Sequence, residues 1–155
     1  MVSEQARLSV EVIKAGRAPV APAFVRKVLG RATALPEVVA RLPVGVSTIA
    51  VRITGDGELR RLNEAYASND SVTDVLAFAG SGDHLGDLAI SWAMVVRQAA
   101  EHGHPALTEC GLLCVHGMLH LLGWDHSTAA ERREMTRLTL SALALAGLTL
   151  APGRI

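Results

Sequence analysis

Three histidines within eleven residues are the side chains whose type and spacing most directly suggest chemistry. His116, His120 and His126 form this run in a chain that has six histidines in all. On an α-helix, at about 100° per residue, His116 and His120 are about 40° apart and share one face. Gly123 can end that helix in a left-handed turn and bring His126 toward the same point. Three imidazoles with an open fourth position are typical of a catalytic zinc site.

The same spacing, H-x-x-x-H-x-x-G-x-x-H, is the pattern of metzincin proteases, which carry a glutamate base directly after the first histidine. Here that position is Gly117, so the ligands are kept while the protease base is absent. A structural zinc is also disfavoured, because such sites fill four positions with protein ligands, mostly cysteine. An open site implies catalysis, in which zinc lowers the pKa of a bound water and polarises a substrate oxygen.

Residues around the three histidines have plainer interpretations as well. Asp125 is placed either to orient an imidazole or act on the bound water, or to stabilise the turn. His102 and His104 flank a glycine in a predicted loop and are expected at the surface. Cys110 and Cys114 are four residues apart on one predicted helix, which is a poor arrangement for a disulfide, so both are expected to be buried thiols. Cys114 lies two residues before His116, about 200° around the helix, and is expected to face away from the metal.

Short strands and amphipathic helices must position these residues. Alternating or β-branched runs predict four strands, at residues 8–12, 46–53, 74–78 and 86–91, the last two suited to pair as a hairpin. Helical spacing predicts helices over 23–34, 56–65, 91–102, 108–122 and about 129–145, with Asp56 as one N-cap and Ser127 or Thr128 as another. Pro36 and Pro43 bracket a predicted loop.

These elements predict a single α+β domain over residues 1–155. We expect a small mixed sheet of about four strands packed against about five helices, with the metal site on a central buried helix. Apolar residues make up 50% of the chain and aromatic residues 3%, so the core must be aliphatic. No uninterrupted apolar run is long enough to span a membrane, which predicts a cytoplasmic protein without a membrane partner.

Charge is distributed unevenly although the formal net charge is zero. Residues 1–61 carry ten Lys or Arg and five Asp or Glu, whereas residues 62–155 carry five and ten. This asymmetry favours either a basic face for a polyanion or a solvated surface of mixed charge.

The histidine run resembles the signature of the YbeY family, which are bacterial single-strand-specific endoribonucleases that act as rRNA maturation factors. The family motif has the form H-G-x-L-H-L-x-G-Y/W-D-H, and residues 116–126 carry every fixed element, with Trp124 in the aromatic place. Residues 73–78 are similar to the family's T-D-V-L-S-F, with Ala77 replacing serine, and residues 85–90 resemble its L-G-D-I/L-x-I strand. The order and spacing agree over roughly residues 46–147.

This resemblance implies an α+β fold and one Zn²⁺ per chain bound by His116, His120 and His126. It implies hydrolysis of phosphodiester bonds in single-stranded RNA, including 16S rRNA 3′-end maturation and ribosome quality control, so the expected partner is the small ribosomal subunit. Beyond the metal-bound water, the candidate catalytic groups are Asp125, Thr73 and Asp74, among which the sequence selects none.

One departure from the family concerns contacts to RNA phosphate. Family members carry a Tyr-Arg-Gly-Lys-Asp run before T-D-V-L-S-F, and its arginine is thought to engage RNA, but here Ala67 and Asn69 replace the two basic residues. Arginine suits bidentate phosphate binding, so we expect Arg52, Arg60 and Arg61 to compensate as substrate-binding residues. Two alternatives stay open: a metal-stabilised ribosome-binding factor with weakened catalysis, and another zinc hydrolase such as an atypical metalloprotease.

Overall fold

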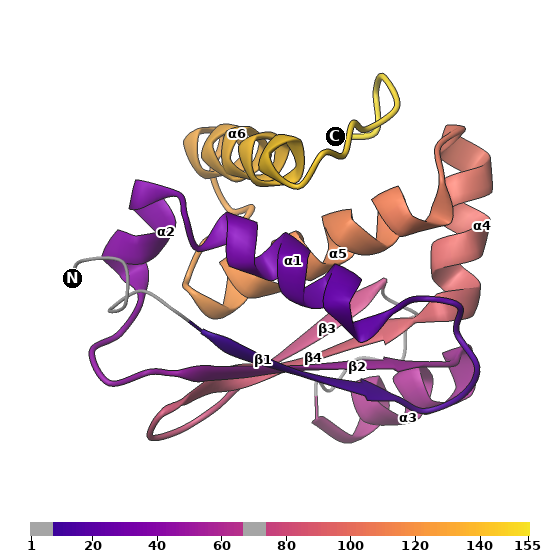
Figure 1. Cartoon of the computed structure of the whole chain (residues 1–155), viewed down its shortest axis with the longest axis horizontal. Coiled ribbons are helices and arrows are strands. Elements are labelled where there is room, and N and C mark those ends of the chain that lie inside the picture. The colour runs from indigo at the N-terminus through magenta and orange to yellow at the C-terminus, as the bar shows by residue number, and fades with distance from the viewer. Residues whose placement is uncertain (1–7, 67–73) are drawn as a thin grey trace.

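One four-stranded mixed sheet, in the order β1-β2-β4-β3, forms the base of the fold (Figure 1). The structure is a computed structural model that describes residues 8–66 and 74–155. Its strands are β1 (Ser9–Lys14), β2 (Thr48–Thr54), β3 (Val75–Ala79) and β4 (His84–Ser91). The first three strands in the sheet order run parallel, and β3 pairs antiparallel with β4 at one edge. The predicted mixed sheet and the predicted hairpin are both confirmed.

Six helices accompany the sheet in the described residues. They are α1 (Pro22–Ala32), α2 (Pro36–Arg41), α3 (Asp56–Tyr66), α4 (Trp92–His102), α5 (Ala106–Leu121) and α6 (Ala129–Leu145). The α+β class and the single domain architecture agree with prediction, with one helix more than expected. Over the described parts of the chain, none of the helices combines the length and the apolar character needed to cross a bilayer.

The additional helix is α2, where a loop between two prolines was predicted. Pro36 occupies the first turn of α2. A backbone N–H at that position would have no partner within the helix, so proline loses no hydrogen bond there, and its fixed φ already suits a helix. Glu37 lies in the first turn and Arg41 in the last, so both charges complement the helix dipole. The prediction of a loop was wrong because the first proline starts the helix.

The helices cover the two faces of the sheet unequally. Figure 1 shows α1 and α5 on one face with α6 lying across them, and α3 on the opposite face. Along β2, Val51 and Ile53 pack into the core beneath α1 and α5. The intervening Arg52 therefore points to the face that carries α3, because successive strand residues alternate between faces.

The helix α5 is buried because it is apolar nearly all round. Its fully or almost fully buried side chains are Cys110, Leu112, Leu113, Cys114, Val115, Met118 and Leu119. A hydrogen bond with Cys110 and burial raise the pKa of the Cys114 thiol, and both cysteines are free. The prediction that they pack as buried thiols is confirmed.

Two predicted helix caps have different outcomes. The Thr128 hydroxyl accepts a hydrogen bond from the Glu131 backbone N–H at 3.0 Å, which confirms it as the N-cap of α6. Asp56 is instead the first residue of α3. Its carboxylate accepts hydrogen bonds from the Ser91 hydroxyl at 2.5 Å and from Arg97 at 2.9 Å, so it joins α3 to the start of α4.

Candidate metal centre

A left-handed turn after α5 returns the chain toward its own helix. Gly123 has a φ of +98°, which a residue with a side chain rarely adopts. The Trp124 N–H donates to the Leu119 carbonyl at 3.0 Å, and the Gly123 N–H donates to the His120 carbonyl at 3.0 Å. These bonds satisfy the last carbonyls of the helix. The predicted glycine turn is confirmed, and it places the segment containing His126 beside the end of α5.

The three histidine rings gather at this turn. The ring centroid of His126 lies 5.1 Å from that of His120 and 6.0 Å from that of His116. Three imidazoles bound tetrahedrally to one zinc ion, with Zn–N distances of about 2.0–2.1 Å, have centroids about 5 Å apart. The His120–His126 spacing matches this value, and the His116–His126 spacing is about 1 Å longer. In the described residues no three His, Cys, Asp or Glu side chains are arranged to hold a metal ion as they stand.

The His120 ring is oriented by the backbone that follows it. Its Nδ1 lies 3.1 Å from the Trp124 carbonyl oxygen. A carbonyl can only accept, so Nδ1 carries the proton and Nε2 keeps its lone pair. A metal-binding histidine has the same division between its two nitrogens, with the outer N–H donated to an oxygen. The chemistry of this ring therefore fits a metal ligand.

The segment that carries His126 is held in place by contacts from α2 and α6. Arg132 donates to the His126 carbonyl oxygen at 3.0 Å. The indole N–H of Trp124 donates to Glu134 at 2.5 Å, and the Arg41 guanidinium stacks 3.8 Å from the centre of the Trp124 ring. Both sides of the return loop are thus fixed by side chains from outside α5.

Burial and the neighbouring histidines lower the pKa of two of the three rings, His116 and His120. Burial, assisted by the neighbouring His126 and His120, lowers the pKa of His116 to about 4. Burial and His126 also lower the pKa of His120. Neutral imidazoles have the lone pairs that metal coordination requires. His116 is half-buried whereas His120 and His126 are exposed, so the cluster opens to solvent and to a substrate.

Two of the three candidate catalytic groups, Asp125 and Asp74, lie in the described residues. The Asp125 carboxylate accepts the His126 backbone N–H at 2.7 Å, which is a turn-stabilising contact. Burial and His126 lower the pKa of His120, and the negative charges of Asp125 and Asp74 oppose that shift. Thr73 lies outside the described residues. A catalytic role for any of the three stays a prediction.

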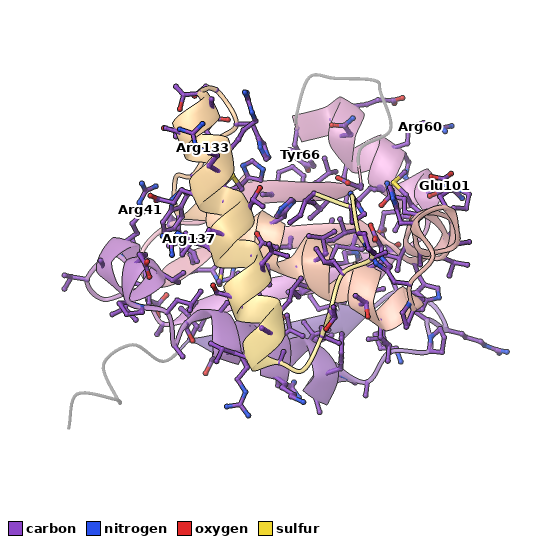
Figure 2. The ribbon with its side chains drawn as sticks, turned by 90° about the horizontal axis from the view of Figure 1, so that it is seen from above. Arg41, Arg60, Tyr66, Glu101, Arg133 and Arg137 are labelled. Atoms are coloured by element: carbon purple, nitrogen blue, oxygen red, sulfur yellow. The ribbon has the colours of Figure 1, made fainter. Side chains whose placement is uncertain are left out.

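The predicted substrate-binding arginines lie on the other side of the sheet from α5. Arg52 points to the face carrying α3 and pairs with Glu58 through Nε–Oε1 and Nη2–Oε2 contacts of 2.5 and 3.2 Å. Arg60 and Arg61 belong to α3. Figure 2 shows Arg60 on the opposite side of the molecule from Arg133, which lies on α6. Their role in RNA binding stays a prediction.

A buried ion cluster two turns before His116 was missed by the sequence reasoning. Glu109 has no exposed surface, and its carboxylate accepts hydrogen bonds from Arg154 at 2.6 and 3.0 Å and from His104 at 2.7 Å. The other ring nitrogen of His104 accepts the Ala151 N–H at 3.0 Å. With 4% of its side chain exposed, His104 is not at the surface, so that prediction was wrong.

A sequence signal for this cluster did exist. Glu109 precedes His116 by seven residues, which places both on one face of α5, about 20° apart. An acid on the same face as the histidines, within an otherwise apolar helix, needs a cationic partner. The Arg154 charge also contributes, after burial and the other two histidines, to lowering the pKa of His116, so the cluster adjoins the site.

Comparison with known proteins finds relatives over most of the chain. A family model described as "Endoribonuclease YbeY" matches residues 20–146. An "Endoribonuclease YbeY" from Roseiflexus castenholzii is 44% identical over 116 residues, covering 65% of this chain and 73% of the relative. Another of that name from Chloroflexus aurantiacus is 40% identical over 131 residues, covering 76% and 84%.

A solved structure shares the fold at lower sequence identity. The solution structure of a Thermotoga maritima protein superposes with a TM-score of 0.58 at 19% identity, over 95% of this chain and 100% of that chain. The family match spans the sheet strands β2 to β4 together with the helix and turn that carry the three histidines. The chain therefore belongs to the YbeY family of endoribonucleases.

Proposed function

We propose that this chain is a zinc-dependent, single-strand-specific endoribonuclease that acts in the cytoplasm on the 3′ end of 16S rRNA and in ribosome quality control. The observation that carries the proposal is the gathering of three histidine rings at a solvent-open turn, where the centroid of His126 lies 5.1 Å from that of His120 and 6.0 Å from that of His116. Family membership supports the RNA-cleaving activity.

In this proposal His116, His120 and His126 hold one Zn²⁺, which when bound supplies Lewis-acid chemistry at a phosphodiester. The Trp124 carbonyl accepts a hydrogen bond from Nδ1 of His120, which leaves the lone pair of Nε2 available for the metal. Arg132 fixes the backbone of His126. Preorganisation of this kind lowers the free energy needed to gather the ligands.

Arginines of α6 stand close to the histidines and can bind phosphate in place of the basic residues that positions 67 and 69 lack. Arg132, which touches the His126 carbonyl, and its neighbour Arg133 are exposed on α6. Arg41 lies on the same side of the molecule as Arg133 (Figure 2). Guanidinium groups bind phosphate with charge-assisted hydrogen bonds, so this side of the site suits the backbone of an RNA strand.

The test is cleavage of a 16S rRNA 3′ precursor, offered once as a single strand and once annealed to a complementary strand. We expect cleavage of the single strand only, loss of cleavage with a chelator, and recovery when zinc is restored. His116→Ala should abolish cleavage, whereas His102→Ala, an exposed histidine on α4, should retain it. Undiminished cleavage by His116→Ala would refute the proposed mechanism.

A ribosome-binding factor with weakened catalysis is a second candidate, favoured by the absence of a basic residue at both positions 67 and 69. Such a protein would bind rRNA and retain zinc yet leave the precursor intact at stoichiometric zinc. A metalloprotease of the metzincin type has no comparable support. A Cβ at Gly117 would lie 2.7 Å from a Leu88 methyl carbon, so a glutamate base would not fit there without movement.

A further inference from the structure

A groove of about 330 Å³ opens on the sheet face that carries α3. We call it the α3 groove; the residues lining it include Ile13, Arg52, Leu62, Tyr66, Phe78 and Asp87. Its walls therefore come from α3 and from all four strands. None of these residues takes part in the histidine cluster.

An exposed aromatic side chain forms one wall of the α3 groove. Tyr66 is 72% exposed, and its ring contacts Phe78 edge to face, with centroids 5.8 Å apart and planes at 76°. Tyr66 is the only tyrosine in a chain with two phenylalanines and two tryptophans. The contact holds the tyrosine ring in place while most of it stays in solvent. A ring fixed in this way offers a stacking surface with little entropy left to lose.

Polar groups of both kinds stand beside the aromatic wall. The Arg52 side chain is 37% exposed, and its guanidinium is held by Glu58. The Asp87 side chain is 56% exposed, and its carboxylate lies 3.1 Å from the His84 ring. The groove thus combines an aromatic surface, apolar walls, a hydrogen-bond donor and an acceptor. A nucleobase has the complementary features, which are flat π-faces and an edge bearing both donors and acceptors.

The α3 groove and the histidine cluster are separated by the edge of the sheet. The side chain of Val75 in β3 points toward α5. A Cβ atom added at Gly117 of α5 would lie 3.2 Å from one of the Val75 methyl carbons. Phe78 is three residues further along the same strand and points to the other face, about 10 Å away along the strand. Since β3 is an edge strand, an extended RNA chain can pass over it from one face to the other.

We propose that the α3 groove binds one unpaired base of the RNA substrate, stacked on Tyr66, a few nucleotides from the phosphodiester at the histidine cluster. This inference rests on the proposed function, because it concerns the same RNA strand. It also assigns a physical origin to single-strand specificity. A base in a duplex is already paired and stacked, so it is not free to enter the groove.

The test measures binding, so that it does not depend on metal loading. Non-cleavable 2′-O-methyl RNA, single-stranded and fluorescently labelled, is titrated with the metal-free protein and followed by anisotropy. Tyr66→Ala should weaken binding roughly tenfold, because aromatic stacking contributes this much per base. Tyr66→Phe should bind like the wild type. Leu107→Ala, which removes an exposed apolar side chain from α5, should have no effect.

A scan with a single abasic nucleotide at each position identifies the stacked base. One position should weaken binding to the wild type, and the same position should have no further effect on Tyr66→Ala. If the wild type binds RNA but neither Tyr66→Ala nor any abasic position changes its affinity selectively, the groove assignment is overturned while the proposed function stands. If the wild type binds no single-stranded RNA, the proposed function fails and this inference fails with it.

Discussion

At the scale of single residues, the absence of a side chain at Gly117 allows α5 to lie directly on the sheet. A Cβ there would stand 2.7 and 3.0 Å from two methyl carbons of Leu88 and 3.2 Å from one of Val75. The residue after His116 is therefore set by packing. The same contact explains why the ligand spacing of a metzincin is present without its glutamate.

Gly117→Ala should destabilise the protein by roughly 1–3 kcal/mol, because overpacking a core forces neighbouring groups to shift. The matched control is Gly30→Ala in α1, where a Cβ meets nothing within 4 Å. That control should stabilise the protein by roughly 0.5–1 kcal/mol through helix propensity. The free energies of unfolding are measured by urea titration, and one common m-value, the slope of free energy against urea concentration, is used for the wild type and both variants. Equal effects of the two substitutions would show that the helix does not approach the sheet as described.

Residue-scale prediction from the sequence succeeded where the spacing was local. His116 and His120 are on one helix face, and the return of His126 depends on one nearby glycine, so the sequence alone could bring these rings together. The partners of Glu109 could not be found this way. Arg154 lies 45 residues from Glu109 along the chain, and no local periodicity reports such a pairing.

At the scale of elements, the segment after α6 is fastened to α5 by the buried carboxylate of Glu109. Arg154 makes two hydrogen bonds to it, and 14% of the arginine side chain is exposed. His104, in the loop between α4 and α5, donates to the same carboxylate and accepts from Ala151. One acid therefore joins three parts of the chain beside the histidine cluster.

Arg154→Ala should destabilise the protein by roughly 3 kcal/mol, because removing one partner of a buried pair leaves the other charge uncompensated. Arg97→Ala breaks the more exposed pair with Asp56, whose side chains are 53% and 34% exposed. The Arg97→Ala control should lower the free energy of unfolding by less than about 1 kcal/mol. Thermal and urea unfolding at pH 7 measure the stability loss of each variant relative to the wild type. A loss for Arg154→Ala no larger than for the control would mean that the pair does not stabilise the fold.

The ion pair of Glu109 and Arg154 also predicts how the difference in unfolding free energy between the wild type and Arg154→Ala depends on pH. Burial raises the pKa of Glu109, but hydrogen bonds from Arg154 and His104 outweigh it and lower the pKa below its ordinary value of 4.5. A depressed carboxyl pKa stabilises the fold above 4.5, and this contribution is lost as the pH falls through the lower folded-state pKa. The free-energy gap between wild type and Arg154→Ala should therefore shrink below pH 4.5. A gap that grows on acidification would contradict this account.

Most elements could be predicted because their signals are local. The hairpin of β3 and β4, the glycine-terminated α4 and the Thr128-capped α6 all follow from short patterns. The exception, α2, was hidden because proline both interrupts and starts helices. The strand order β1-β2-β4-β3 was beyond sequence reasoning, because it depends on pairing between distant segments.

At the scale of the whole molecule, cations are divided between two sides of the fold. Arg41, Arg133 and Arg137 lie on the side of α6, and Arg60 lies on the opposite side (Figure 2). Arg137 is paired with Glu37 at 3.0 Å, and Arg61 lies 3.9 Å from Glu58. The described arginines of the basic half therefore do not gather on one face, since Arg41 stacks on Trp124 beside the histidines and Arg60 lies on the opposite side. Arg132, from the acidic half, touches the His126 carbonyl.

Salt dependence of RNA binding distinguishes these two sides. Each phosphate contact to a single strand contributes about 0.7 to the slope of log affinity against log salt. Replacing Arg132 and Arg133 together by alanine should reduce the slope by about 1.4 if both contact phosphate. The Arg60/Arg61 double-alanine variant is the matched comparison and should change it less. The opposite ranking would assign the RNA backbone to the face of α3.

The central claim is that three histidines of this fold hold one zinc ion together. Native mass spectrometry of protein titrated with zinc measures this directly, for the wild type and for His116→Ala, His120→Ala and His126→Ala. We expect about one zinc per wild-type chain and strongly reduced occupancy in each variant, because a catalytic site keeps only three protein ligands. Full zinc occupancy in any one of the three variants, or none in the wild type, would contradict the claim.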